Sequence, residues 1–324
     1  MSGVRADRAA GQRSGIGADR MADGIRADLM AGGIRADRMA GGIRAGRAAA
    51  TRADASRPTV TCVFAVTDTP VPDEVLAVTW GHDGGGPLRI LAAGPLHLVV
   101  QDVPAAEFGE AALTERLGRP EELERCARAH HRGVETAASA GPVVPFPMAT
   151  LYLDDGNAVR AVTARETSLR ALLDRLRDRT EWAVKVHGPR TAAAPAAAAA
   201  GAEPADGRSY LRRASDRRRT ERESRERALA QAHAVDRELR RYAVAATRHR
   251  PQSERLTGRS VPQLLNVAYL VDDGRRDEFV RAVGELARDA RASAVEVTMS
   301  GPWIPYSFAR PDEAERAAHQ EAGA

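Results

Sequence analysis

Few residues of this chain have the types and spacing that catalysis or metal binding requires. His130 and His131 are the one adjacent histidine pair. Consecutive positions on a helix point roughly 100° apart, so these two rings cannot chelate one ion together. His130 also lies on an apolar stripe of an expected helix. We therefore prefer a histidine that is satisfied in a core or an interface over a metal ligand.

Two acidic tetrapeptides form the other candidate site. LDDG occupies 153–156 and VDDG occupies 271–274, and each directly follows an expected strand. Asp-Gly is common in turns, because Asp bonds its own backbone and Gly accepts unusual dihedrals. We interpret both tetrapeptides as turns, with a metal site as the alternative.

The sequence lacks the standard catalytic and ligand-binding motifs. It contains no HExxH, GxSxG, Walker A, CxxC or EF-hand spacing. Its two cysteines, Cys62 and Cys126, exclude a disulfide framework and a multi-cysteine zinc site. We therefore expect a protein that is not an enzyme and that uses no cofactor and no metal, in a reducing, cytoplasmic setting. No apolar run approaches the roughly 20 residues that a membrane span needs, so no membrane partner is expected.

Basic charge is the next possible source of function. The chain has 48 Lys and Arg against 44 Asp and Glu, and Lys185 is the only lysine. Residues 208–227, here called the arm, contain nine arginines and four acidic residues. Such a segment suits a phosphate-binding helix, but it also suits a solvated or protein-binding helix with Glu–Arg pairs. Because the arm offers no platform for stacking bases, we favour the protein-binding interpretation.

The other elements must position these residues. Residues 1–57 carry a nine-residue repeat, such as GIRADLMAG at 24–32, which is too small and too poor in apolar residues to bury a core. They are expected to form a disordered tail. A first α+β domain is expected over 58–155. Its predicted elements are strands at 59–66 and 74–80, a hairpin at 88–103, a helix from Pro120, and an extended segment at 141–155.

A second α+β domain is expected over 156–310, followed by a disordered tail at 311–324. Its predicted elements are a helix at 158–178, a half-buried strand at 181–188, a flexible linker at 188–207, a long charged helix at 208–250, a strand at 264–271, a helix at 275–290 and a strand at 294–299. This order of elements predicts an overall α+β class with two domains, the C-terminal one ferredoxin-like.

The long helix changes character along its length. Its second half carries a coiled-coil-like stripe of Ala228, Ala232, Val235, Leu239, Tyr242 and Ala246. Continued backwards, the same stripe meets Arg225, Glu221 and Arg218. The first half therefore cannot be buried along its length, and it should project as a charged arm or be covered by something outside its own domain.

Several stretches resemble the family of gas vesicle proteins GvpL/GvpF. The similarity lies in GPVVPFPMATLY (141–152), EWAVKVHG (181–188), GRSYLRR (207–213), RAHHRGVETA (128–137) and, most specifically, NVAYLVDDGRRDEFVRAVGEL followed by GPWIPYSFA (266–309). It spans about 58–310. The chain departs from the family pattern at Pro147, Met148 and Ala149, and Ile304 stands where Pro is common.

The resemblance implies a gas vesicle accessory protein without enzymatic activity. The family has two α+β domains and is thought to contact the small, hydrophobic vesicle shell protein during assembly. The implied partners are that shell protein and other gas vesicle accessory proteins, and the implied location is the cytoplasm and the gas vesicle. The alternative is a basic, nucleic-acid-associated protein that acts through the arm.

The aromatic stretch GPWIPYSF at 301–308 raises a question of its own, because only 4% of the chain is aromatic. Pro302 and Pro305 prevent an ordinary central strand, so an extended segment at a sheet edge is expected. We predict one face in the core and one presented to a partner. The expected partner contacts are Arg217, Arg218, Arg219, Tyr306 and Phe308, and the expected structural residues are Trp182, Tyr269 and Trp303. An all-core aromatic stretch is the alternative.

Overall fold

The computed structural model describes residues 58–189, 207–250, 261–291 and 295–309, with the side chains of 207–211, 213, 214 and 291 left undescribed. The two expected tails and almost all of the expected linker lie outside these residues. The described residues form two compact units: unit 1 comprises residues 58–177 and Ala309, and unit 2 comprises the described residues between 178 and 308. The expected boundary at 155/156 therefore falls too early, because the helices that follow it pack against the first unit.

Unit 1 is built around an antiparallel sheet in the order β2-β3-β1-β4, with β5 also paired to β1. Its strands are β1 (Thr59–Thr67), β2 (Leu88–Ala93), β3 (Leu96–Pro104), β4 (Val143–Pro145) and β5 (Leu151–Tyr152). The β2–β3 hairpin turns at Gly94, whose φ of 62° is a conformation that glycine adopts without strain.

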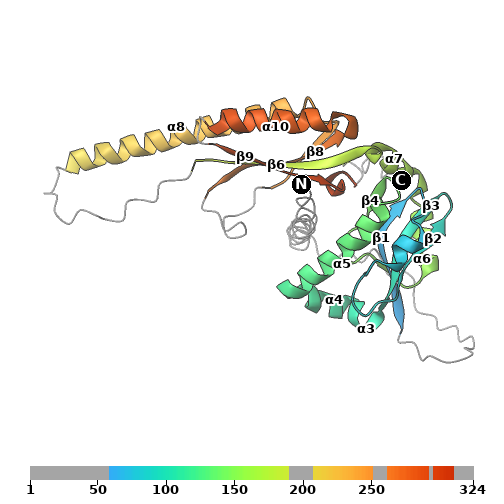
Figure 1. Cartoon of the computed structure of the whole chain (residues 1–324). Helices are drawn as coiled ribbons and strands as arrows, with labels where there is room; N and C mark the ends of the chain where they lie inside the picture. Colours follow the sequence, from blue (N-terminus) through green and yellow to red (C-terminus); the bar gives the residue numbers. More distant parts are fainter. Residues whose placement is uncertain (1–57, 190–206, 251–260, 292–294, 310–324) are drawn as a thin grey trace, which may run out of the picture. The chain divides into compact units, whose positions relative to one another are not determined.

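The six described helices of unit 1 pack around this sheet and partly on one another. They are α2 (Asp73–Ala77), α3 (Ala105–Phe108), α4 (Glu110–Leu117), α5 (Pro120–Ala138), α6 (Asp155–Thr163) and α7 (Glu166–Leu176). Phe64 faces α5, where a Cβ on Gly133 would lie 2.4 Å from its ring, whereas Thr61 bonds Asp155 of α6. Every residue from Thr61 to Thr67 is accordingly buried. Figure 1 shows α5 running along the sheet.

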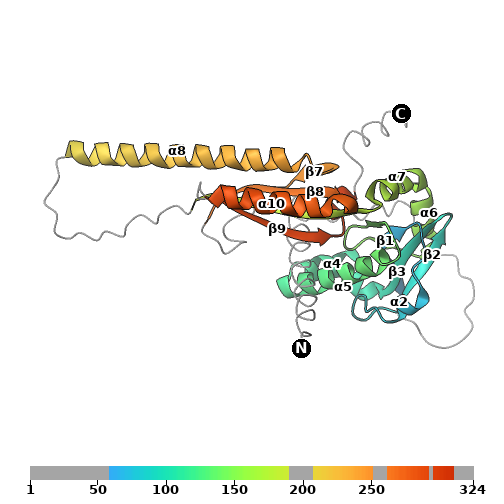
Figure 2. The same cartoon turned by 45° about the horizontal axis from the view of Figure 1, so that its top comes forward.

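Unit 2 contains an antiparallel sheet in the order β7-β8-β6-β9. Along the chain its main elements are β6 (Arg179–His187), α8 (Gly207–Leu239), β7 (Ala245–Arg248), β8 (Gln263–Asp272), α10 (Arg276–Arg291) and β9 (Glu296–Trp303), with short 3-10 helices η1 (Asp273–Arg275) and η2 (Tyr306–Phe308). Helices α8 and α10 lie side by side over one face of the sheet (Figures 1 and 2). The core between them and the sheet is built on Trp182, Val184 and Val186.

Four sequence expectations were wrong in detail. Residues 74–80 are not a strand, because 73–77 form α2 with two acidic residues in its first turn. The expected helix at 158–178 is two helices, α6 and α7. The expected helix at 208–250 ends at Leu239, since 245–248 pair with β8 instead. Strand β6 was expected to have one buried face, but both of its faces contain buried residues. On the second face, Ala183 and Glu181 are 1% and 5% exposed.

Candidate partner-binding surfaces

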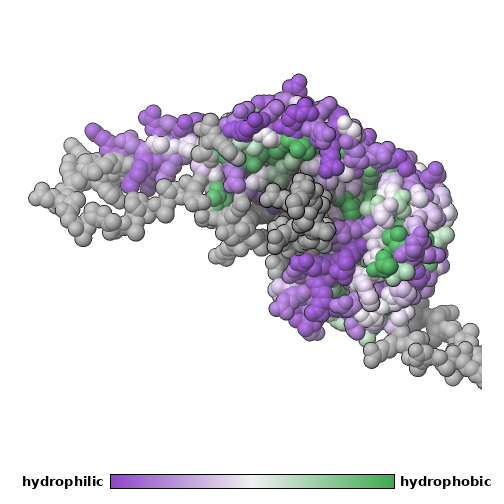
Figure 3. Space-filling view, in the orientation of Figure 1, coloured by the Kyte–Doolittle hydropathy of each residue, from purple (hydrophilic) through white to green (hydrophobic). Residues whose placement is uncertain are grey.

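The arm belongs to a helix whose two halves lie in different environments. In its second half, Ala228, Ala232, Val235 and Leu239 are at most 2% exposed and pack in the unit 2 core. In its first half, residues 215–223 are all exposed, including Arg217, Arg218 and Arg219. Figures 1 and 2 show this half extending past the end of the unit 2 sheet, and Figure 3 shows it as hydrophilic surface. The described part of the arm therefore projects, as its sequence pattern predicts.

Ion pairs along the arm neutralise only part of its charge. Arg219 Nε lies 2.9 Å from Glu223 Oε1, and Arg222 Nε lies 3.8 Å from Glu226 Oε1. Within the described residues, Arg217 and Arg218 form no ion pair. Exposed i,i+4 pairs of this kind stabilise a helix by only a few tenths of a kcal/mol. The arm thus keeps an uncompensated positive surface with little structural role.

The aromatic stretch at the C-terminal end is more closely tied to the sheet than expected. Strand β9 is an edge strand and pairs Trp303 with Glu181 of β6. The chain then leaves the extended conformation and forms η2. Within η2 the backbone N–H of Ser307 donates to Glu181 Oε2, and its hydroxyl donates to Glu181 Oε1, both at 2.8 Å. The segment therefore bonds back to strand β6 instead of leaving the unit.

This arrangement corrects the expected division of the aromatic residues. Phe308 is 3% exposed, so it is a core residue and not an exposed contact. Trp303 and Tyr306 are half-buried. The strict alternation expected of an extended run fails because a 3-10 turn replaces it between Tyr306 and Phe308. Contact of Tyr306, Arg217, Arg218 and Arg219 with a partner stays a prediction.

Trp182 and Tyr269, expected to be structural, are core residues. They are 4% and 0% exposed, and their rings lie 6.2 Å and 5.6 Å from that of Phe279. The Tyr269 hydroxyl donates to Asp236 Oδ1 at 2.8 Å. Burial raises the pKa of Tyr269 above its ordinary value, and the bond to Asp236 adds to that rise. The Tyr269 hydroxyl therefore stays protonated and donates its hydrogen bond to Asp236.

Asp236 joins the end of α8 to the sheet. Besides Tyr269, it accepts from Arg248 Nη2 at 2.9 Å and from Arg240 Nε at 3.1 Å. Burial alone would raise the pKa of this carboxyl, but its hydrogen bonds and the arginines hold the pKa below its ordinary value. A buried carboxylate is stable only with such donors. The sequence alone gives no signal for this role, because a single Asp beside an apolar stripe forms no motif.

Histidine in unit 1 is structural. The ring of Phe64 stacks on both His82 and His130, at 5.4 Å to each ring centroid. His130 is 0% exposed and its Nε2 lies 3.0 Å from the carbonyl oxygen of Phe146. Burial lowers the pKa of His130 to about 4 and the pKa of His82 to about 3, with nearby positive groups adding to the effect at His82. Both rings are neutral near pH 7, so His130 is a core histidine.

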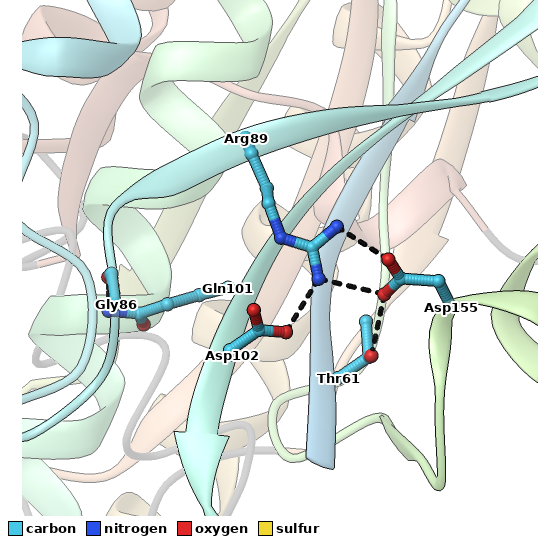
Figure 4. A network of polar contacts seen from close by, with 6 residues as sticks. All are labelled: Thr61, Gly86, Arg89, Gln101, Asp102 and Asp155. Atoms are coloured by element: carbon cyan, nitrogen blue, oxygen red, sulfur yellow. Dashed lines mark hydrogen bonds and ion pairs between the residues drawn. The ribbon is translucent and has the colours of Figure 1, made fainter. Parts of the chain in front are cut away.

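The acidic tetrapeptides lie at helix starts. Asp154 caps α6 by accepting from the backbone N–H of Asn157 at 2.7 Å. Asp155 is held by two nitrogens of Arg89 and by the hydroxyl of Thr61, while Arg89 also binds Asp102 (Figure 4). These bonds lower the pKa of Asp155, the Arg89 bond most. At 271–274, VDDG ends β8 and enters η1.

Metal-ligating groups and cysteine thiols are the remaining candidates for chemistry among the described residues. They contain no group of three or more His, Cys, Asp or Glu placed to hold a metal ion. Cys62 and Cys126 are both buried and free, and burial raises the pKa of the Cys62 thiol to about 12. A thiol that stays protonated is a poor nucleophile. Among the described helices, none has the length and apolarity to cross a membrane.

Comparisons with known proteins agree with this architecture. The model of the family "Gas vesicle synthesis protein GvpL/GvpF" matches residues 61–310. The chain is 39% identical over 242 residues to "Gas vesicle protein L" of Streptomyces sp. (strain CB03234), covering 74% of this chain and 90% of that relative.

Two solved structures share the fold. GvpF from Anabaena sp. PCC7120 matches with a TM-score of 0.56 at 15% identity, over 79% of this chain and 98% of its own. GvpF from Microcystis aeruginosa matches with a TM-score of 0.50 at 15% identity, over 78% and 99%. The family match covers most of the chain and includes both units, so this protein belongs to the gas vesicle synthesis protein GvpL/GvpF family.

Proposed function

We propose that this protein is a non-enzymatic adaptor, or chaperone, that binds the small hydrophobic shell protein during gas vesicle assembly in the cytoplasm. Membership of the GvpL/GvpF family is the observation that carries the proposal. Exposed apolar surface makes a shell subunit prone to aggregate, and a binder that covers such surface keeps it available for assembly. We also propose a ferredoxin-like arrangement for unit 2, supported by its β-α-β-β-α-β order.

The arm is the surface that we assign to partner binding. Those of its arginines whose side chains are described lie in solvent beyond the unit 2 core, and they contribute little to holding that unit together. A helix that is anchored at one end and charged at the other suits a contact with an acidic region of another protein. The other gas vesicle accessory proteins are candidates for the same contact.

Co-expression with the shell protein tests the proposal. The full chain should keep more shell protein in the soluble fraction than expression of the shell protein alone, and the two should co-purify without added nucleotide or metal. Replacing Arg217, Arg218 and Arg219 by Glu should reduce the co-purified amount while the melting temperature stays within about 2 °C. A matched control reverses Arg119, Arg160 and Arg165 of unit 1 to Glu, because these arginines are exposed and form no ion pair with a described carboxylate. Unchanged solubility of the shell protein, with no complex, contradicts the adaptor function.

Nucleic-acid binding remains the second candidate because of the arm's composition. Nine arginines against four acidic residues leave a surface that attracts phosphate. A titration with duplex DNA at increasing salt separates the two functions. Binding whose log K falls steeply with log salt, and which the triple Glu variant loses, supports the nucleic-acid alternative. Weak binding that is equal in wild type and variant favours the adaptor.

A further inference from the structure

Unit 1 exposes two large apolar side chains close together on one loop. Val78 and Trp80 follow α2 and are 75% and 82% exposed. Tryptophan rarely remains this exposed, because its ring has the largest area to bury. Exposed aromatic side chains of this kind are typical anchors of protein interfaces. Figure 3 shows hydrophobic surface in the part of unit 1 that contains α2.

The backbone that carries Trp80 is fixed to helix α5. Arg132 of α5 donates its Nε to the carbonyl oxygen of Trp80 at 3.0 Å and its Nη2 to that of Gly81 at 3.4 Å. The hydroxyl of Thr79 lies 2.9 Å from that of Thr136, also on α5. The indole is thus presented from a held backbone, and a partner that binds it pays little ordering entropy in the loop.

The part of the loop that follows Trp80, residues 81–86, is hydrogen-bonded to one buried side chain. Gln101 of β3 is 2% exposed. Its Oε1 accepts from the backbone N–H of His82 at 2.8 Å, and its Nε2 donates to the carbonyl oxygen of His82 at 3.1 Å. The same Nε2 donates to the carbonyl oxygen of Gly86 at 2.8 Å (Figure 4). A Cβ at Gly81 would lie 2.4 Å from Gln101, which only glycine avoids. These contacts hold the loop against β3, and the Trp80 side chain is exposed.

The charge beside Trp80 indicates what kind of partner fits. Arg132 contacts the loop only through carbonyl oxygens and forms no ion pair with a described carboxylate. Two neighbours on α5 already have carboxylate partners: Arg128 pairs with Glu124, and His131 Nε2 lies 3.2 Å from Glu135 Oε1. An apolar side chain on Trp80 and Val78, with a carboxylate on Arg132, would satisfy both features of this surface.

We propose that Val78, Trp80 and Arg132 form a docking surface for an apolar segment of the shell protein that carries a carboxylate beside its apolar side chain. This inference rests on the proposed function and assigns it a contact in unit 1, separate from the arm. The indole supplies buried area, and the guanidinium fixes the direction of the bound segment.

Binding measurements on single variants of the full chain test the docking surface. Trp80→Ala should weaken the complex with co-expressed shell protein at least tenfold, whereas Trp80→Phe, which keeps an aromatic ring, should weaken it less. Arg132→Lys should retain more binding than Arg132→Gln. Leu153→Ala, which truncates another exposed apolar residue of unit 1 at 58% exposure, is the matched control and should bind like wild type. The tryptophan emission of wild type should shift to shorter wavelength on binding, and Trp80→Phe should lose most of that shift.

The outcomes separate this inference from the function on which it rests. If wild type binds the shell protein and Trp80→Ala binds equally well, the docking surface is wrong and the adaptor function stands. If wild type binds no shell protein, both are overturned. Binding to vesicles of phosphatidylglycerol is the last measurement of the test. Vesicle binding that requires Trp80, together with shell-protein binding that does not, identifies the surface as a lipid contact and overturns the inference.

Discussion

Trp80 and Phe308 lie in two short segments that both combine aromatic residues with glycine or proline, and the structure uses them in opposite ways. The GPWIPYSF segment of unit 2 has the denser aromatic pattern, yet its Phe308 is 3% exposed and its Ser307 is bonded to Glu181. Trp80 stands without another aromatic residue nearby in the sequence and is 82% exposed. The difference lies in where each backbone is anchored: Ser307 draws its segment onto strand β6, whereas Arg132 and Gln101 hold the other loop with its indole outward.

The sharpest test of this comparison is the loss of stability on truncation. Phe308→Ala should lower the free energy of unfolding of the chain by about 3–5 kcal/mol, because it leaves a cavity in a packed site. Trp80→Ala should change it by less than about 0.5 kcal/mol, because the indole has few contacts to lose. Urea denaturation of both variants measures the two values. Equal losses would mean that the two segments do not differ as described.

Acid should loosen the anchor of the Trp80 loop. His82 and His130 are neutral in the folded chain, with pKa values lowered from 6.5 to about 3 and about 4, whereas the unfolded chain binds protons near pH 6.5. Their contribution to stability is therefore fully present above pH 6.5 and is lost as pH falls toward the folded pKa values. Between pH 6.5 and pH 5 the loss is about 1.6 kcal/mol for each histidine, because the unfolded histidine is already half protonated at pH 6.5.

Denaturation curves of wild type and His82→Phe at both pH values measure this effect. The variant keeps an aromatic ring against Phe64 but has no proton to gain, so its stability should depend less on pH than that of wild type. An identical pH dependence in both proteins would show that His82 is not responsible.

A smaller effect is expected at the anchor of the C-terminal segment. Ser307→Ala removes the hydroxyl that donates to Glu181 and leaves the backbone N–H bond in place. The expected loss is about 1–2 kcal/mol, since one bond to a buried carboxylate disappears. Ser168→Ala, which removes an exposed hydroxyl bonded to the Arg165 carbonyl of unit 1, serves as the control and should have less effect. A Ser307→Ala protein as stable as wild type would show that the hydroxyl bond does not help to hold the segment.

Much of the scaffold could be predicted because its signals are local. The start of α5 at Pro120 follows from the fit of proline to a first helical position. Strand β1 follows from its many β-branched residues, and strand β8 follows from a short apolar run that includes Val267, Tyr269 and Val271. The buried stripe from Ala228 to Leu239 follows from helical spacing. The exposure of the first half of α8 follows from the charged residues on that same stripe. Burying them without partners would cost more free energy than the packing of the helix provides.

The tertiary structure decided what local pattern could not. Ala246 has the spacing that continues the helical stripe, but residues 245–248 pair with β8 and form a strand. Ser307 became an anchor because Glu181, 126 positions away, lies beneath it. The exposure of Trp80 depends on Arg132 and Gln101, both distant in sequence. Periodicity records which residues share a face, whereas the side chain that covers that face comes from elsewhere in the chain and is known only once the chain has folded.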